Sequence, residues 1–244
     1  MACILHIETS TRTCSVAVSQ EGAVIFHQEL ADCPSHDVHL ARMVDEAVSF
    51  TDSHAIPFDA VAVSAGPGSY TGLRIGASLA KGFCYARQLK LLALPTLEVL
   101  CVPVLLQYDD LPEDALLCPM LDARRMEVYT ATYTRALRNV LPVRALVVDA
   151  ESLKAQMDEH PMYFFGNGAE KCKSVISHPN AHFLSGIEPL AKWMSPLAEK
   201  AFLREEFADV AYFEPNYLKE FVAIKSKKNL LKEDANTDDK RRGL

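Results

Sequence analysis

The sequence predicts a duplicated α/β fold with a cleft between its two halves. Two strand-strand-strand-helix units follow one another, the first from residue 3 and the second from residue 115. A glycine-rich turn joins an expected buried strand to a helix within residues 60–87. The composition, 49% hydrophobic and 23% charged over 244 residues, is that of an ordinary globular protein with room for a large core.

The first unit opens with an acidic, hydroxyl-rich turn between two expected strands. Strands are expected at residues 3–7, 14–18 and 23–28, and Glu8, Thr9 and Ser10 begin the first turn. A carboxylate that can hold a metal, followed by hydroxyl and backbone donors for phosphate, is the form of a phosphate-handling hairpin. A plain polar hairpin turn with a surface glutamate fits the same residues, and both interpretations stay open here.

Residues 35–51 have the apolar spacing of an amphipathic helix that begins at Pro34 and Ser35. His36 and His39 share one face of its first turn. Two histidines fall short of the three or four convergent ligands that a metal needs, so no metal site is predicted.

The glycine turn is the most distinctive stretch of the chain. The strand at residues 60–63 leads into glycines whose spacing is G-x-G-x-x-x-G, and the last of them precedes Leu73 and not a lysine. This spacing excludes both the dinucleotide fingerprint and the Walker A loop, and it favours a tight turn into a helix at residues 72–87 capped by Thr71. The candidate residues of this loop are Gly66, Gly68, Ser69, Thr71, Gly72 and Arg74.

The helix after the turn is lined with small residues. Gly72, Gly76, Ala77, Ala80 and Gly82 leave little bulk on it, although glycine inside a helix costs about 1 kcal/mol relative to alanine. Such a helix depends on close contact for its stability. The contact is expected either with its own sheet or with a helix of another chain.

The rest of the chain repeats the opening order in weaker form. The acidic loop at residues 109–114 is the expected boundary between a first lobe, residues 1–110, and a reduced second lobe, residues 111–220. Residues 221–244 mix basic and acidic side chains and are expected to form a mobile tail. The other expected elements are strands at 89–94, 115–121, 127–133, 143–148, 162–165 and 181–184, and helices from 96, at 152–159 and at 189–207.

Charge and cysteine usage limit the class of protein. A net charge of -7 argues against a free-standing nucleic-acid binder, although an acidic chain can act on RNA within a complex. Seven scattered cysteines without a C-x-x-C pair predict reduced, buried thiols. No apolar run reaches the length of a membrane span, and the N-terminus does not resemble a signal peptide, so a cytoplasmic protein is expected.

Five motifs together resemble those of the TsaB family, also called YeaZ. They are Ile4 to Thr11, Gly66 to Gly76, Leu121 to Arg124 with Glu127 to Tyr129, Gly166 to Gly168, and Pro215 to Leu218. The resemblance covers residues 1 to about 220 and implies a two-lobed actin-like fold, of the ASKHA and ribonuclease H-like type, with a reduced second lobe. Where the family usually has aspartate this chain has Glu8, which puts a metal or phosphate role of that residue in doubt.

The resemblance also implies a function and partners. Members of the family are non-catalytic subunits in the synthesis of threonylcarbamoyladenosine at position 37 of transfer RNAs that read ANN codons. They bind TsaD, a catalytic paralogue, and are joined by the ATPase TsaE; they touch transfer RNA only through the complex and form homodimers when alone. ATP or ADP, magnesium and the catalytic metal belong to the partners, so no cofactor is expected here.

The partner contact implied by the resemblance lies on two helices of the first lobe. TsaD holds its metal with an H-x-x-x-H pair, whereas His36 is followed by Leu40 here, so that pair is absent. The expected core and partner-contact residues of these helices are His36, Leu40, Met43, Val44, Ala47, Leu73, Ile75, Ala77, Leu79, Ala80, Phe83 and Cys84.

Two other classes of function were weighed. An ATP-dependent small-molecule kinase or an acyl transferase on the same fold would use Glu8, Thr9, Ser10 and Asp122 in the cleft. A peptidase is disfavoured, because the chain has no G-x-S-x-G or H-E-x-x-H motif and no credible Cys-His arrangement.

Overall fold

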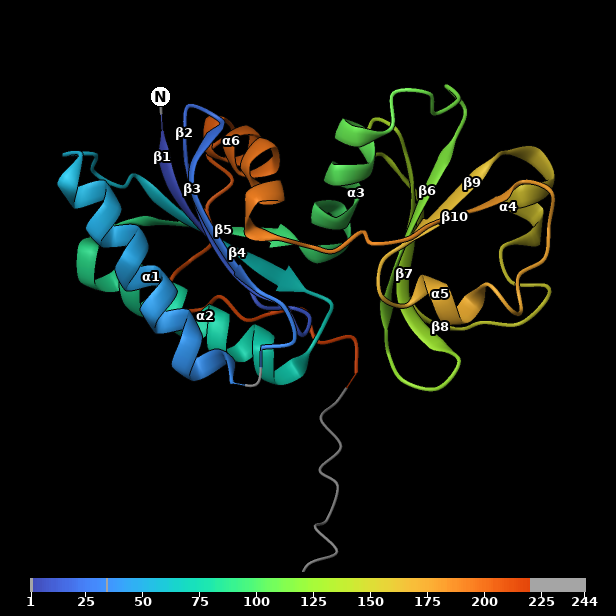
Figure 1. The fold of residues 1–244 in the computed structure, drawn as a ribbon, viewed down its shortest axis with the longest axis horizontal. Coiled ribbons are helices and arrows are strands. Elements are labelled where there is room, and N and C mark those ends of the chain that lie inside the picture. The colour runs from blue at the N-terminus through green and yellow to red at the C-terminus, as the bar shows by residue number, and fades with distance from the viewer. Residues whose placement is uncertain (1, 34, 220–244) are drawn as a thin grey trace, which may run out of the picture.

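The computed structural model describes residues 2–33 and 35–219, and it places two sheets side by side (Figure 1). Pro34 and the expected tail at residues 221–244 lie outside the described residues. The strands of the first sheet are β1 (Cys3–Glu8), β2 (Cys14–Gln20), β3 (Ala23–Leu30), β4 (Ala60–Gly66) and β5 (Lys90–Pro95). Those of the second are β6 (Leu116–Asp122), β7 (Glu127–Thr134), β8 (Asn139–Val147), β9 (Met162–Phe165) and β10 (Ala181–Leu184).

The two sheets have the same topology. The first sheet has the strand order β3-β2-β1-β4-β5. Read from its β8 edge, the second sheet has the order β8-β7-β6-β9-β10. Each strand of the second lobe therefore occupies the place of the strand five numbers earlier in the first lobe. In each sheet the first strand is antiparallel to the second and parallel to the fourth. The expected duplicated α/β fold is therefore confirmed.

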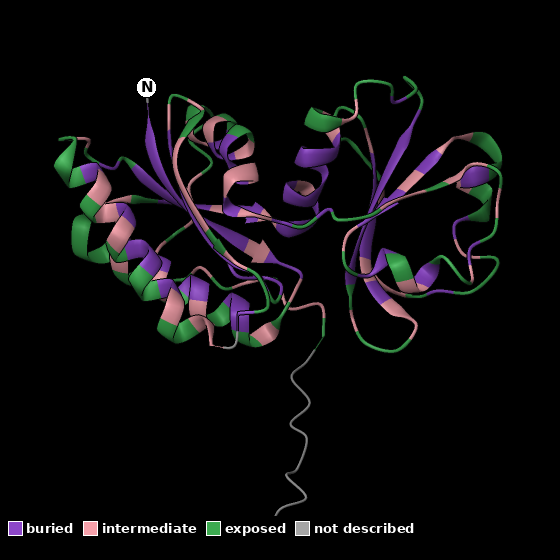
Figure 2. Ribbon diagram, in the orientation of Figure 1, coloured by how far each residue is buried: buried purple, intermediate pink, exposed green. Residues whose placement is uncertain are grey.

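Apolar side chains on both faces explain why the central strands are buried. All six residues of β1 are buried, as expected of a strand covered on both sides. His6 lies in the middle of this strand, and one of its ring nitrogens lies 2.7 Å from the Ser19 hydroxyl. Burial lowers the pKa of His6 to about 3, so the ring stays neutral. Figure 2 shows that the central strands of both sheets are buried, whereas α1 and α2 are buried along one stripe.

Helices cover both faces of each sheet. α1 (His36–Ser53) and α2 (Tyr70–Arg87) lie side by side on the outer face of the first sheet (Figure 1). The outer face of the second sheet is covered by α4 (Lys154–Glu159) and α5 (Ala169–Cys172). The inner faces are covered by α3 (Thr96–Gln107), the 3₁₀ helix η1 (Ala191–Met194) and α6 (Ser195–Leu203).

The third helix of each lobe packs on the sheet of the other lobe. α3 follows β5, yet Leu97, Leu100 and Val104 pack in the core of the second sheet. In return, η1 and α6 follow β10, and Met194 and Ala198 pack on the inner face of the first sheet. The expected lobes, residues 1–110 and 111–220, do not include this exchange of helices. The C-terminal helices of the expected second lobe pack on the sheet of the first lobe.

Two further elements differ from the sequence expectation. The single helix expected at residues 189–207 is instead η1 followed by α6, and the backbone leaves the helical conformation after Leu203, where Glu205 has a φ of 56°. The short helix α5 was not expected at all. Within residues 2–33 and 35–219, no helix combines the length and the apolar character needed to cross a membrane.

Candidate functional site

The glycine loop packs against the turn that follows β1. A Cβ atom added to Gly68 would lie 2.5 Å from the Ser10 carbonyl oxygen, and one added to Gly72 would lie 2.0 Å from the Thr9 carbonyl oxygen. A Cβ at Gly76 would lie 2.3 Å from the Thr9 hydroxyl. No side chain fits at such distances, so the backbone that these glycines approach belongs to the same chain.

Hydrogen bonds join the same two segments. The Ser69 amide donates to the Ser10 carbonyl at 2.7 Å, and the Thr9 hydroxyl donates to the Gly72 carbonyl at 2.8 Å. The helix itself is capped by Ser69, whose hydroxyl accepts from the Gly72 amide at 3.3 Å. The expected cap, Thr71, is instead an exposed residue of the first turn of α2.

The Pro215–Leu218 motif packs on the other side of the glycine loop. Gly66 has a φ of 96°, and a Cβ there would lie 2.8 Å from the Asn216 carbonyl oxygen. The Asn216 amide donates to the Ala65 carbonyl at 2.7 Å, and the rings of Tyr70 and Tyr217 lie 4.6 Å apart. Two motifs that are far apart in the sequence therefore form one packed unit.

Glu8, the last residue of β1, is fully buried. One of its carboxylate oxygens accepts from the Ser10 amide at 2.6 Å. Burial raises the pKa of Glu8 to about 7, against the opposing effect of hydrogen bonds from Ser10, Ser64 and Thr9. This carboxylate is therefore closed off from the solvent through which a metal or phosphate would have to reach it.

A polar cleft of about 670 Å³ lies between the lobes. Ser10 and Thr11 line it, but Glu8 and Thr9 do not, so only part of the expected phosphate loop faces the cleft. Other lining residues are Arg12, Cys33, His36, Gly68, Ser69, Tyr70 and Thr71 from the first lobe, Leu121, Asp122, Ala123, Arg124, Tyr129 and Asn167 from the second, and Lys219.

The charged residues of the second-lobe rim are paired within the chain. Asp122 forms an ion pair with Lys171, and its amide donates to the Asn167 side-chain oxygen at 2.9 Å. Lys219 forms an ion pair with Glu127. These contacts hold the rim and the C-terminal segment of the described chain together. Within residues 2–33 and 35–219, no three His, Cys, Asp or Glu side chains are grouped as metal ligands would be.

Most of the expected partner-contact residues face the first sheet. Leu40, Ala47, Leu73, Ala80 and Cys84 are core residues at 1% exposure or less. The buried set also contains Met43, Val44 and Ala77, whereas Ile75, Leu79 and Phe83 are half-buried.

His36 is the expected contact residue that faces the cleft. It is half-buried at the start of α1 and lies among the residues that line the cavity. Its Nε2 is 3.1 Å from the Thr11 carbonyl oxygen.

The solvent-facing side of these two helices carries Ile75 and Leu79 from the expected set, and its other residues lie outside that set. We call it the α1–α2 surface, and it consists of Val38, Ala41, Asp45, Ile75, Ser78, Leu79, Gly82, Tyr85 and Ala86. Val38 and Tyr85 are 65% and 84% exposed, so this side presents large apolar side chains to the solvent. A Cβ at Gly82 would meet no atom within 4 Å. The helical period of 3.6 residues sorts the residues of a helix into faces. It identifies the solvent-facing side only when at least one residue is already known to be buried.

Comparisons with known proteins agree with these motifs. The family model of TsaD, tRNA N6-adenosine threonylcarbamoyltransferase, matches residues 33–226. The tRNA threonylcarbamoyladenosine biosynthesis protein TsaB of Bacillus subtilis is 30% identical over 88% of this chain and 93% of its own length. The protein of the same name from Escherichia coli is 28% identical over 91% of this chain and 96% of its own. The solved structure of YeaZ from Pseudomonas aeruginosa superposes with a TM-score of 0.76 at 26% identity, covering 89% of this chain and all of that one.

The duplicated sheets, the cleft and these matches define a two-lobed α/β protein of the actin-like class. Within that class, the chain belongs to the TsaB family, also called YeaZ.

Proposed function

We propose that this chain is a non-catalytic subunit in the synthesis of threonylcarbamoyladenosine at position 37 of transfer RNAs that read ANN codons. It acts as a scaffold that binds a TsaD-like catalytic paralogue and allows a TsaE-like ATPase to join. Membership of the TsaB family supports this proposal, as do the names of the relatives from B. subtilis and E. coli. The chain then works in the cytoplasm and meets transfer RNA only through the complex.

The observation that carries the proposal is the α1–α2 surface. Two helices of 18 residues each lie side by side and expose Val38 and Tyr85 next to the small residues Ser78 and Gly82. Small side chains let a second pair of helices approach closely, and the apolar ones supply contact area at the centre of the interface. A partner with a similar pair of helices fits this surface, and so does a second copy of this chain when the partner is absent.

The buried position of Glu8 supports a role without nucleotide chemistry in this chain. A kinase or acyl transferase of this fold would need a carboxylate facing the cleft, whereas Glu8 is fully buried and is not among the residues that line the cleft. In the proposed complex, ATP or ADP, magnesium and the catalytic metal are bound by the partners.

The test uses size-exclusion chromatography with light scattering on this chain mixed with TsaD from the same cell. A one-to-one complex is expected. The variant Gly82→Arg places a long charged side chain in open space on the α1–α2 surface, where it should weaken association at least about tenfold. Arginine is also a better helix former than glycine, so the variant should remain folded.

The matched control is Leu203→Arg. Leu203 is 73% exposed on α6, on the opposite face of the first sheet, and this change should leave association intact. Normal binding by Gly82→Arg, or equal loss in both variants, would contradict the proposed surface. Charges at Ala77 or Ala80 are unsuitable for this test, because both residues are buried and the substitutions would damage the fold.

A further inference from the structure

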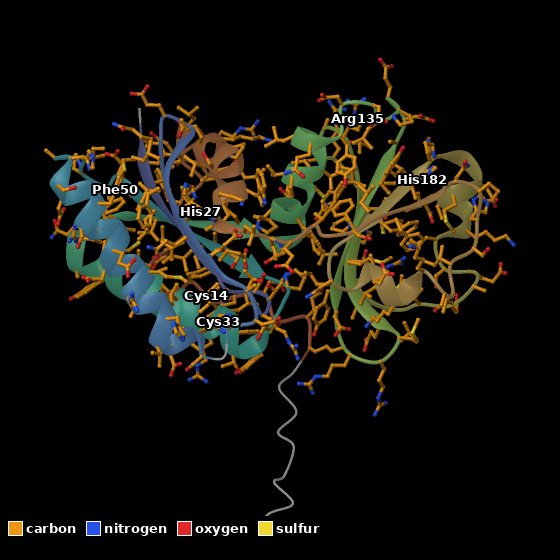
Figure 3. All side chains as sticks on the ribbon, viewed as in Figure 1. Cys14, His27, Cys33, Phe50, Arg135 and His182 are labelled. Carbon is orange, nitrogen blue, oxygen red and sulfur yellow. The ribbon has the colours of Figure 1, made fainter. Side chains whose placement is uncertain are left out.

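Two of the seven cysteines lie next to each other at the edge of the inter-lobe cleft. Cys14 is the first residue of β2, and Cys33 follows β3, where its amide donates to the Arg12 carbonyl at 2.9 Å. Both thiols belong to the core cluster between the first sheet and α1. Figure 3 shows the two residues close together at the lower end of the first sheet.

The two thiols interact directly. The pKa of Cys14 is raised to about 12, first by burial and then by the charge of the Cys33 thiol and a side-chain hydrogen bond with it. Elsewhere in the described chain, Cys118 interacts with Cys101 and Cys172 through charge alone, and all three are completely buried. Cys14 and Cys33 are thus the two cysteines joined by a side-chain hydrogen bond, in agreement with their closeness in Figure 3.

The two members of the pair differ in how close they lie to the cleft. Cys33 is 8% exposed and is among the residues that line the cleft, whereas Cys14 is 0% exposed and lies behind it. An oxidant small enough to enter the cleft would therefore meet Cys33 first. Accessible thiols with a second thiol in reach are the usual arrangement of reversible thiol pairs.

We propose that Cys14 and Cys33 are a reversible redox pair that a hydroperoxide entering the inter-lobe cleft converts into a disulfide. The Cys33 thiol gives up its proton as its sulfur attacks the outer peroxide oxygen; the O–O bond breaks, and the alcohol or water leaves with that proton, giving a sulfenic acid. The Cys14 sulfur then attacks the Cys33 sulfur; the S–O bond breaks, and water leaves with the Cys14 proton. Two thiols supply the two electrons that reduce the peroxide, and a dithiol reductant reverses the reaction.

The disulfide would tie the chain just before α1 to the start of β2. Cys33 and His36 both line the cleft, so the bond would fix the position at which α1 begins. This inference does not depend on the proposed function, because the thiols and the cleft are complete within this chain.

The sequence offers a direct experiment. Trypsin cleaves after Arg12 and Arg42 and finds no lysine or arginine between them, so one peptide, residues 13–42, carries both cysteines. The full chain is treated with a small excess of hydrogen peroxide, alkylated with iodoacetamide without reduction, and digested. We expect this peptide to lose two hydrogen atoms and take up no alkyl group, and to take up two alkyl groups when dithiothreitol follows the peroxide.

Two variants make the result specific. In Cys33→Ser the change in peptide 13–42 should disappear. In Cys84→Ser it should persist, since Cys84 lines a separate hollow beside β5 and is 1% exposed. A peptide that keeps two alkylatable thiols after peroxide, or that carries only a sulfinic acid on Cys33, would overturn the proposal. Amide hydrogen exchange in the first turn of α1 should slow in the oxidised protein, and unchanged exchange would refute the proposed effect on that helix.

Discussion

The two lobes share a strand order but differ in the helices that connect the strands. In the first lobe α1 and α2 have 18 residues each, whereas α4 and α5, at the same places in the second lobe, have 6 and 4. At 1.5 Å per residue, the first pair spans about 27 Å and the second pair less than about 10 Å. The short helices suffice to cover a sheet, so the length of α1 and α2 provides an additional outer surface.

The glycine loops of the lobes show the same difference in detail. Gly66 is the last residue of β4 and Gly166 follows the equivalent strand β9, with φ of 96° and 98°. However, Glu8 at the end of β1 is buried, whereas Asp122 at the end of β6 is exposed and paired with Lys171. The end of the central strand is therefore closed to solvent in the first lobe and open to it in the second.

The largest effect on stability should come from adding a side chain where the glycine loop approaches the turn after β1. In Gly72→Ala the new Cβ would lie 2.0 Å from a backbone oxygen, so the free energy of unfolding in urea should fall by more than about 3 kcal/mol. In the glycine loop of the second lobe, Gly168→Ala brings its Cβ within 2.9 Å of the Leu121 carbonyl carbon, and should lose about 1 kcal/mol. Equal losses would show that the two loops are packed alike.

The next effect concerns the buried carboxyl. Burial raises the pKa of Glu8 from 4.5 to about 7, so between these values the folded chain holds more protons than the unfolded chain. Stability is therefore lost as pH rises from about 4.5 to 7, by up to about 3 kcal/mol. Relative to wild type, Glu8→Gln should be more stable at pH 8 than at pH 5, as measured by urea unfolding at both values.

Asp122→Asn is the matched control for this prediction. Its side chain lies at the exposed end of the equivalent strand, and its stability difference from wild type should change little between pH 5 and pH 8. His6 also titrates during unfolding, but it is present in every variant and cancels in the difference. A Glu8→Gln difference that is flat with pH would mean that Glu8 is already ionised in the folded chain.

The smallest effect on stability is expected on the solvent-facing side of α2, at Gly82. A Cβ at Gly82 meets no atom within 4 Å, in contrast to Gly72 on the same helix. Gly82→Ala should therefore raise the free energy of unfolding by about 0.5 to 1 kcal/mol, because alanine restricts the unfolded chain and favours the helix. A decrease would indicate that the outer side of α2 is already packed within the free chain.

The strands were predictable because their signal is local. Apolar runs bounded by turns placed all ten strands to within a few residues, including the weak edge strand β10 (Ala181–Leu184). The cap of α2 was predicted two residues late, at Thr71, since Ser69 and Thr71 are both suitable hydroxyl residues and only the backbone decides between them. Helix α5 has 4 residues, too few for any periodic pattern.

The candidate site was predictable in part. The glycines correctly indicated a close backbone approach, but the partner in that contact, Thr9 and Ser10, is more than fifty residues away in sequence. The amphipathic pattern of α1 and α2 selected Leu40 and Leu73, which face the sheet, because such patterns identify the buried stripe first. The exposed residues that could meet another protein, such as Tyr85, give no periodic signal of their own.

The exchange of α3 and α6 between the sheets also bears on how the chain is made. The inner face of the first sheet, with Ile4, Ala62 and Leu92, is covered by Met194 and Ala198. The ribosome completes β5 at Pro95 and reaches the end of α6, Leu203, roughly one hundred residues later. At about 5 to 20 residues per second, that apolar face waits some 5 to 20 s for its cover. During this interval the nascent N-terminal half is a substrate for chaperones, although every one of its strands has already been synthesised.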